Sequence, residues 1–327
     1  MQQAEEAGEP IDQQSAANPA PNNNSNNEAA TAAQKPHLAP HRQFLRLCRN
    51  LCVVYLAFGL VFASPLYTMI ALRPEGPASP LYQLPKILAS PREEYFFASQ
   101  SGQKLHGWLF RTPGSNRVIL VHHGNAGNIL HRLFIAKHCI LTGSSVFIYD
   151  YRGYGKSEGS VALANLSEDG LSAYDFLAKQ LKFSHIVNYG ESIGSGVACL
   201  VSTQRPCDGV ILQSGICSLP SVAKDGVFFL KRYPDSIYPQ PHFENLHLVK
   251  ELHKPLLVVH GMRDTMVPPR HSEKLFAAAA EPKQFVKLPA CGHNDVGDKD
   301  EALFDKSLQD FINSIYERDS NKTTNGS

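Results

Sequence analysis

The feature that most limits the fold of this chain is a regular alternation of short apolar runs and helical segments, which begins near Arg92. Runs such as Val118–His122 are rich in β-branched residues and bounded by polar ones, as expected for strands buried on both faces. The predicted strands are Glu94–Phe97, Leu105–Phe110, Val118–His122, Ser145–Tyr151, His185–Tyr189, Gly209–Gln213, Leu256–His260 and Gln284–Leu288. The predicted helices include Ala126–Leu141, Leu166–Leu181, Ser192–Thr203 and Ala302–Tyr316. This order predicts an α/β fold with a mostly parallel sheet flanked by helices, opened by an antiparallel hairpin at Ser101–Gly102.

Residues 217–255 interrupt the alternation. The interval is too long for a simple connection and contains the apolar run Val227–Leu230 together with Tyr233 and Tyr238. Long insertions in an α/β unit often form lids or walls of a substrate site. The sequence predicts a short cap insertion here, and it leaves open whether the insertion shapes a site or only packs as an extra surface helix.

The N-terminal part of the chain has a different composition. Residues 1–40 are rich in Gln, Asn, Ala and Pro and are predicted to be disordered. Residues 51–72 carry no charge, and as a helix they would rise about 33 Å, enough to cross a hydrocarbon core of about 30 Å. We therefore expect a transmembrane anchor at 51–72, a catalytic domain at 92–318 and a disordered tail at 319–327.

Basic residues indicate an orientation for this anchor. They are more numerous before it (Lys35, Arg42, Arg46, Arg49) than after it (Arg73, Lys86). The imbalance predicts a single-pass protein with a cytoplasmic N-terminus and an extracytoplasmic domain. Two alternatives stay open: a signal peptide cleaved near Val61–Ala63, and a buried helix of the soluble domain.

Charge and cysteine content narrow the possible partners. The chain has 31 Lys+Arg and 30 Asp+Glu, a formal net charge of +1, so no overall attraction to nucleic acid is expected. Its seven cysteines are scattered without metal-finger spacing, and an odd, dispersed set is not a disulfide framework. Cys139 and Cys199 fall in apolar helical patterns and are expected to be buried thiols.

A candidate nucleophile lies between a predicted strand and a predicted helix. Gly190–Gly194 reads G-E-S-I-G and fits the G-x-S-x-G pattern centred on Ser192. In that setting the glycines allow a sharp turn that exposes the Ser hydroxyl above the carboxyl edge of the sheet. The helix N-terminus then directs free N–H groups at a developing oxyanion.

A serine nucleophile needs a base, and the base needs an acid. His293 stands just past the last predicted strand, and Asp264 follows the strand Leu256–His260. Both loops are expected at the same sheet edge as Ser192, in the chain order Ser, Asp, His. Asp295 is the alternative acid, although two residues from His293 it cannot easily reach the far nitrogen of the ring.

The oxyanion hole is expected to use two backbone N–H groups. One belongs to Ile193, the residue after the nucleophile, and the other to Asn125 in the loop that follows the strand Val118–His122. His122 and His123 alternatively suggest a metal pair, but neighbours on a strand point to opposite faces. We expect neither a metal nor a cofactor.

Five motifs occur in order along the chain, and together they resemble a known family. They are His123–Asn128, Asp150–Ser157, Gly190–Gly194, the turn Gly261–Asp264 with Val267-Pro268, and Gly292–Asp295. From roughly Glu93 to Ile315 the chain is similar to α/β-hydrolase-domain proteins, including eukaryotic membrane-anchored members and acyl-protein thioesterases that remove palmitate. The resemblance implies an α/β-hydrolase fold and a catalytic triad at the positions of Ser192, Asp264 and His293.

The chain also differs from some of these proteins, and one of the five motifs is expected to be structural. Depalmitoylases of this kind use a Cys-rich tail, whereas here only Cys48 and Cys52 lie near the expected membrane segment. Residues 150–157, including Tyr151 and Arg152, are expected to shape the turn beneath the site.

The expected activity is hydrolysis of carboxylic esters or thioesters through an acyl-enzyme, on acyl-protein or lipid-like substrates. The alternatives are a peptidase of the same fold and a catalytically silent, membrane-tethered binding module.

Overall fold

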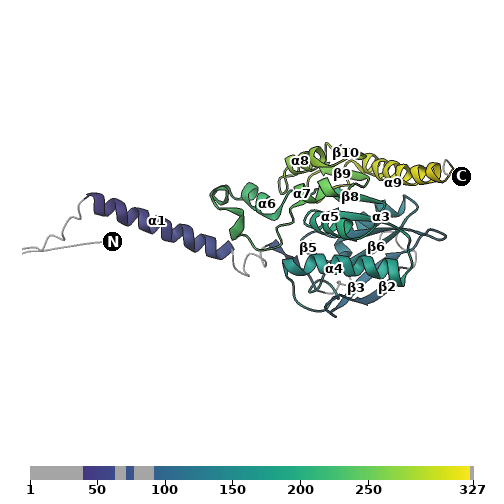
Figure 1. Cartoon of the computed structure of the whole chain (residues 1–327), viewed down its shortest axis with the longest axis horizontal. Helices are drawn as coiled ribbons and strands as arrows, with labels where there is room; N and C mark the ends of the chain where they lie inside the picture. Colours follow the sequence, from purple (N-terminus) through teal and green to yellow (C-terminus); the bar gives the residue numbers. More distant parts are fainter. Residues whose placement is uncertain (1–39, 63–70, 77–91, 325–327) are drawn as a thin grey trace, which may run out of the picture. The chain divides into compact units, whose positions relative to one another are not determined.

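The computed structural model describes residues 40–62, 71–76 and 92–324 (Figure 1). The chain divides into two units, Met1–Leu51 and Cys52–Ser327, and helix α1 (Pro40–Phe62) contains the division point. The helix begins before the uncharged stretch does, with a proline at its first position, where the missing N–H costs no hydrogen bond. Residues 1–39 of the predicted tail and residues 63–70 of the predicted anchor lie outside the described ranges. Among the described residues, no helix has both the length and the apolar composition that crossing a bilayer requires.

The second unit is built on an eight-stranded sheet, which confirms the predicted strands. Its order is β10-β9-β8-β7-β4-β6-β3-β2. Strands β2 and β3 form the predicted antiparallel hairpin, β3 also runs antiparallel to β6, and the remaining pairs are parallel. The strands are β2 (Glu93–Ala98), β3 (Lys104–Phe110), β4 (Arg117–His122), β6 (Ser145–Asp150), β7 (His185–Glu191), β8 (Gly209–Gln213), β9 (Leu256–Gly261) and β10 (Lys283–Leu288).

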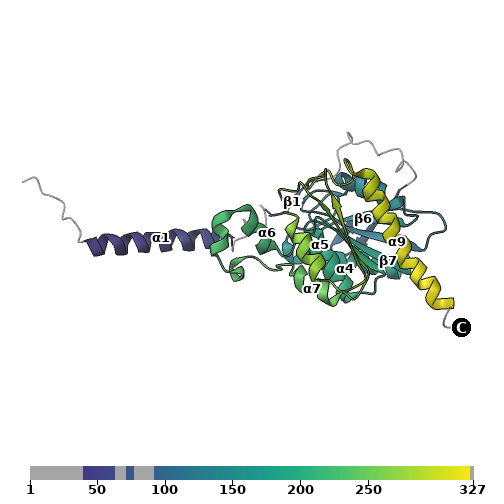
Figure 2. The ribbon, with the colours of Figure 1, turned by 90° about the horizontal axis from the view of Figure 1, so that it is seen from above.

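Helices cover both faces of the sheet (Figure 2). The helices of this unit are α3 (Leu133–Ile140), α4 (Leu163–Asp175), α5 (Gly194–Gln204), α6 (Leu219–Gly226), α7 (Asn245–Glu251), α8 (Arg270–Ala278) and α9 (Glu301–Thr324), of which α6 lies away from the sheet. Apolar residues of α3 and α9 pack with one face of the strands, and those of α4 and α5 pack with the other. A further cluster joins α5, α7 and α8. Burying both faces explains why the strands β4, β6, β8 and β9 consist mostly of apolar residues.

The loop after β4 departs from the predicted helix Ala126–Leu141. Residues Ala126–Gly127 form the short strand β5, which pairs in parallel with β1 (Arg73–Pro74). A 3-10 turn, η2 (Ile129–Arg132), then leads into α3. Two local features delay the helix: Gly127 has a φ of +78°, and the Asn128 side chain caps the turn by accepting a hydrogen bond from Leu130 N.

Two further helices differ from their predicted limits. Helix α4 starts at Leu163 and ends in a π-helical turn, η3 (Phe176–Gln180). Helix α9 continues to Thr324, into the tail 319–327 that was predicted to be disordered. Extending an existing helix forms one hydrogen bond for each residue that is ordered, so a polar end can follow a well-packed helix without a nucleation step.

The cap insertion contains α6, two 3-10 turns, η4 (Phe228–Arg232) and η5 (Asp235–Ile237), and α7. Helix α6 begins with a capping box between Ser218 and Ser221. Leu219 and Leu230 of the insertion are buried. The insertion is therefore packed against the domain and is not a loose connection.

Candidate active site

Ser192 stands at a strained turn between β7 and α5. Its φ is +54°, in the left-handed region that a residue with a side chain rarely adopts. Its backbone N–H donates to the carbonyl of Gln213 at the end of β8, at 2.9 Å. The strain is thus held by the adjacent strand, as expected where the geometry of a functional residue is imposed by its surroundings.

The two glycines of the motif are required by close packing. A Cβ at Gly194 would collide with the carbonyl oxygen of His122 on β4. A Cβ at Gly190 would press on Ser195 and Ala198 of α5. The φ value in the left-handed region belongs to Ser192 itself, which corrects the expectation that the glycines make the sharp turn.

His293 and Asp264 meet at the same edge of the sheet. His293 Nδ1 lies 2.6 Å from Asp264 Oδ2, and the Asp264 side chain is completely buried. Asp264 also accepts hydrogen bonds from the backbone N–H groups of Met266 and Val267. The second nitrogen of the ring, Nε2, remains for contact with another group, which is the arrangement a His base requires.

The carboxylate of Asp264 is kept ionised by its neighbours. Burial opposes its charge, but hydrogen bonds from His260 and His293 outweigh burial and hold the pKa of Asp264 well below its usual range. His260 Nε2 lies 3.2 Å from Asp264 Oδ2 and 2.8 Å from the carbonyl of Val267. Asp264 is therefore an anion that faces two imidazole rings.

Asp295 has other partners. Its carboxylate lies 2.5 Å from Lys299 Nζ and accepts a hydrogen bond from Gly292 N. Of the two acids considered from sequence, only Asp264 contacts the His293 ring.

The loop that carries Asn125 is held from three sides. The backbone carbonyl of Asn125 accepts hydrogen bonds from Arg73 N and from the Tyr154 hydroxyl, both at 2.8 Å. Its side-chain amide donates to the carbonyl of Ala71 at 3.0 Å. Within the described part of the chain, the backbone N–H groups of Asn125 and Ile193 have no hydrogen-bond acceptor. No described residue therefore competes for these two N–H groups.

Two cavities share Asn125, Ser192, Met266 and His293 in their walls. The first, about 260 Å³, is almost entirely apolar. Its remaining lining comes largely from the cap insertion and includes Leu219, Val222, Ala223, Val227 and Leu230. The insertion therefore shapes the candidate site, which decides the question that the sequence left open.

The second cavity, about 440 Å³, has a mixed lining with charged side chains in its wall, and we call it the polar cavity. Its charged lining consists of Arg73, Glu75, Arg132 and Glu191. Arg132 and Glu191 form a buried ion pair with Arg132 Nε 2.8 Å from Glu191 Oε2, and His131 lies 3.4 Å from Glu75. Ser192 and His293 thus stand between an apolar cavity and a polar one.

The residues beneath the site act as packing and hydrogen-bonding partners. His122 contacts the Tyr149 hydroxyl, and His123 Nδ1 donates to the carbonyl of Gly124. Burial lowers the pKa of His122 to about 3 and that of His123 to about 4, so both rings are neutral at physiological pH. Arg152 forms a buried ion pair with Asp169, which anchors the turn after β6.

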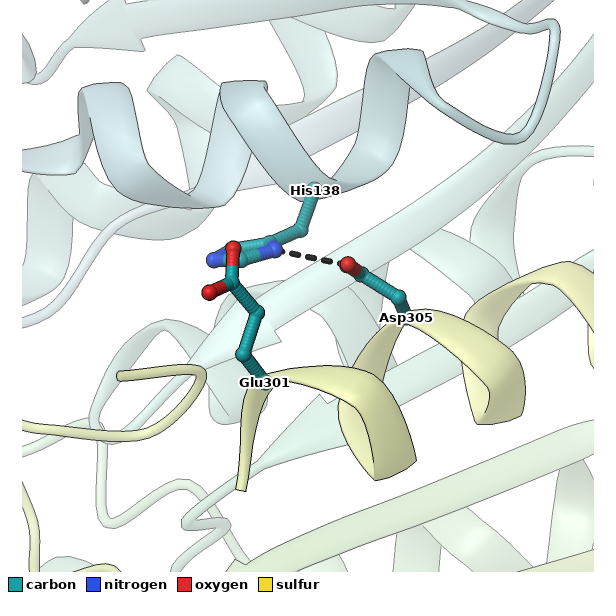
Figure 3. A group of neighbouring side chains, drawn as sticks. All are labelled: His138, Glu301 and Asp305. Carbon is teal, nitrogen blue, oxygen red and sulfur yellow. Dashed lines mark hydrogen bonds and ion pairs between the residues drawn. The ribbon is translucent and has the colours of Figure 1, made fainter. Parts of the chain in front are cut away.

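A separate cluster has side chains of the kind that bind metal ions. His138 on α3 and Glu301 and Asp305 on α9 place one ligand atom each within 4.8 Å of one another (Figure 3). His138 Nδ1 lies 2.6 Å from Asp305, and Lys137 Nζ lies 2.5 Å from Glu301. With both carboxylates already paired, the cluster serves as a polar clamp between α3 and α9.

Three contributors to the site were not found from sequence. His260, Glu191 and Arg132 contact predicted site residues or their loops, yet each looks like an ordinary polar residue in the chain. The sequence positions of two of them could have identified them. His260 is near the carboxyl end of a strand, four residues before Asp264, and Glu191 is inside the G-x-S-x-G motif. Arg132 offered no such signal.

The chain is similar to known proteins along most of its length. The family model described as serine aminopeptidase, S33, matches residues 114–253. The Mycobacterium tuberculosis protein MT2364 is 34% identical over 260 residues, which cover 77% of this chain and 90% of that protein. The α/β-hydrolase domain-containing protein WAV2 of Arabidopsis thaliana is 30% identical, over 62% of this chain and 72% of its own. The Saccharomyces cerevisiae membrane protein YNL320W is 32% identical, over 63% and 74%.

Solved structures share the fold. The esterase Pf2001 of Pyrococcus furiosus superposes with a TM-score of 0.62 at 18% sequence identity, over 74% of this chain and 97% of the esterase. At that identity the similarity establishes the architecture of the domain.

Proposed function

This chain belongs to the α/β-hydrolase family, and from this membership we propose that it is a serine hydrolase that cleaves carboxylic esters or thioesters through an acyl-enzyme. Ser192 is the nucleophile, His293 the general base and Asp264 the acid that orients the base. The observation that carries the proposal is that Ser192 and His293 line both cavities, while Asp264 Oδ2 is hydrogen-bonded to His293 Nδ1.

The reaction has two halves and needs no cofactor. Ser192 Oγ attacks the carbonyl carbon while its proton passes to His293 Nε2, and the oxyanion receives hydrogen bonds from the N–H groups of Asn125 and Ile193. The tetrahedral species then expels the alcohol or thiol, which takes the proton from His293. Water attacks the acyl-enzyme by the same route, releasing the acid and restoring Ser192. Asp264 stays ionised throughout and stabilises the imidazolium.

The two cavities assign the two halves of the substrate. The apolar cavity under the cap suits an acyl chain, because burying its methylene groups is favourable by about 0.8 kcal/mol each. The polar cavity suits a hydrophilic leaving group that contacts Arg73 or Glu75. Acyl-proteins and lipid-like esters both have this division into an apolar and a polar half.

Labelling and turnover test the nucleophile together. Ser192→Ala should abolish labelling by a fluorophosphonate and lower the hydrolysis of p-nitrophenyl esters by about 10⁶, since the three residues act as a unit. Ser160→Ala, at an exposed serine, is the control and should label and hydrolyse like the parent. A Ser192→Ala variant that still turns over would remove the proposal. A parent chain that neither labels nor hydrolyses would favour the silent binding module.

An aminopeptidase is the second candidate, supported by the description of the matching family model. Such an enzyme needs a carboxylate for the substrate ammonium group, and the polar cavity has Glu75 and Glu191. Glu191 is already paired with Arg132, which leaves Glu75. Comparing aminoacyl p-nitroanilides with p-nitrophenyl acyl esters separates the two candidates. Faster turnover of the anilides, lost in Glu75→Gln, would favour the aminopeptidase.

We further propose that residues 51–72 anchor the chain in a membrane, with the N-terminus cytoplasmic and the catalytic domain on the other side. The proposal rests on the uncharged stretch and on the greater number of basic residues before it. The full chain should then stay with membranes in alkaline carbonate. Protease added outside intact cells or to the lumenal side of vesicles should digest the domain. Release by carbonate would exclude the anchor, and digestion only from the cytoplasmic side would reverse the orientation.

A further inference from the structure

The tip of the cap exposes aromatic and basic side chains together. We call it the cap tip and define it as Val227, Phe228, Phe229, Lys231 and Arg232. Phe228 is 72% exposed and Phe229 43% exposed, whereas Leu230 between them and the basic pair is buried at 1%. Large apolar side chains exposed side by side mark a surface that meets another apolar phase.

The positive charges of the cap tip surround its most exposed ring. Lys231 Nζ and Arg232 Cζ each lie 5.7 Å from the centre of the Phe228 ring. In the part of the chain that the structure describes, neither has a carboxylate partner. The acids nearby are paired elsewhere, Asp225 with Arg270 and Asp235 with Lys224. The cap tip therefore combines an apolar surface with two positive charges that no described carboxylate pairs with.

The cap tip is continuous with the apolar cavity of the candidate active site. Val227 belongs to both, since it is 36% exposed and also lines the cavity that contains Ser192 and His293. Leu230, directly after the exposed phenylalanines, lines the same cavity. An apolar chain that reaches the cap tip thus finds an apolar wall leading toward Ser192.

We propose that the cap tip inserts into the bilayer leaflet on the side of the membrane where the catalytic domain lies, that it binds more strongly when this leaflet contains anionic lipids, and that acyl groups pass from the leaflet into the apolar cavity beside it. Aromatic side chains are favoured at the headgroup boundary, and lysine and arginine next to them are attracted to anionic lipids. The route into the cavity rests on the proposed hydrolase function. The insertion itself does not depend on it.

A kinetic comparison on two substrates tests the route. The full chain is reconstituted in phosphatidylcholine vesicles with or without phosphatidylserine, and hydrolysis is measured for a short water-soluble ester and for a long-chain ester dissolved in the bilayer. Phe228→Ser should lower the rate on the bilayer ester about tenfold, because a phenylalanine leaves the interface, and should leave the soluble ester within twofold. Phe228 does not line the cavity, so the chemistry of the site is untouched.

The chain offers a matched control in Phe96. Its ring is 46% exposed on β2 and has Lys104 Nζ 5.1 Å from its centre, a similar aromatic and basic pair far along the chain from the cap. Phe96→Ser should hydrolyse both esters like the parent. Lys231→Gln should lower the rate on the bilayer ester about fivefold in vesicles with phosphatidylserine and only slightly in vesicles without it. Equal rates for Phe228→Ser and the parent on the bilayer ester would overturn the route.

A fluorescence experiment tests the insertion without any reaction. The only tryptophan, Trp108, is buried, so Phe228→Trp adds one exposed reporter. Its emission should shift to the blue in vesicles containing phosphatidylserine and be quenched by brominated acyl chains. Emission that stays unquenched in vesicles would overturn the insertion. A shift that depends on protein concentration without lipid would assign the surface to a second copy of the chain. If Phe228→Trp is quenched in vesicles but the parent hydrolyses neither ester, the hydrolase function is rejected and the insertion stands.

Discussion

Glu191 and Arg132 form a buried ion pair directly behind the loop that carries Asn125, with Arg132 Nε 2.8 Å from Glu191 Oε2. The same oxygen accepts a hydrogen bond from Gly124 N at 2.8 Å. Glu191 immediately precedes Ser192, and Gly124 immediately precedes Asn125. The pair therefore connects the turn of the proposed nucleophile to the loop of the proposed oxyanion donor. Burial opposes ionisation, but Arg132 outweighs it and lowers the pKa of Glu191.

Breaking this pair should affect both stability and rate. We expect Glu191→Gln to destabilise the fold by about 3 kcal/mol, because Arg132 is left as a buried charge without a counterion. Misplacing Asn125 should lower kcat about tenfold or more with a small change in KM. Urea unfolding and steady-state ester kinetics measure the two effects. Glu158→Gln, which removes an exposed pair with Lys104, is the control and should change neither.

The acid of the proposed triad can be assigned by a pair of isosteric changes. Asp264→Asn should lower kcat on the order of 10⁴, because the amide no longer holds the His293 ring in the required tautomer. Asp295→Asn should cost far less, since Asp295 is bonded to Lys299 and Gly292. Ester kinetics of both variants decide the assignment. A larger loss in Asp295→Asn would move the acid to the other loop.

The lowered pKa of Asp264 predicts a pH dependence of stability. An acid whose pKa is lower in the folded state stabilises the fold above its unfolded pKa of about 3.9, and this contribution is lost as the pH falls through the folded pKa. The difference in unfolding free energy between the parent and Asp264→Asn should therefore be largest near neutral pH and shrink below about pH 4. Urea unfolding from pH 7 to pH 3 measures it. A difference that grows on acidification would contradict the lowered pKa.

His260 should contribute to the same effect. It lies 3.2 Å from Asp264 Oδ2, and its hydrogen bond helps to lower the pKa of that carboxyl. His260→Gln should raise the folded-state pKa of Asp264 toward its unfolded value, so that less stability is lost on acidification and the loss is complete at a higher pH. The same urea series, run on this variant, tests the shift. His247→Gln removes an exposed histidine paired with Glu251 and should leave the profile unchanged.

The apolar cavity should set the acyl-chain preference. Ala223 lines it, and Ala223→Phe would occupy part of its roughly 260 Å³. We expect p-nitrophenyl acetate to be hydrolysed at nearly the parental rate, while medium and long acyl esters lose about tenfold, because lost burial of several methylene groups is worth more than 1 kcal/mol. Ala302→Phe on the exposed side of α9 serves as the control. A uniform loss for all chain lengths would argue against an acyl site under the cap.

Local sequence patterns determined the strands, most helices and the positions of the candidate site residues. The apolar runs have the length and β-branched content of buried strands, and the carboxyl ends of parallel strands share one edge of a sheet. Ser192, Asp264 and His293 each follow such a run, so their convergence could be predicted from chain order alone. The structure brings Ser192 and His293 to one cavity and Asp264 to the His293 ring.

Only the tertiary structure decided what surrounds those residues. Arg132 and Glu191 are 59 residues apart. Strand β5 pairs with β1, although the local sequence of β5 predicted the start of a helix. The cap could be identified as an insertion, yet its role as a cavity wall depended on where Leu219 and Leu230 pack. A local sequence pattern indicates the conformation that a segment prefers by itself. Contacts between distant side chains depend on the burial and the desolvation of charge that arise when the whole sheet and its helices assemble, and no single segment encodes them.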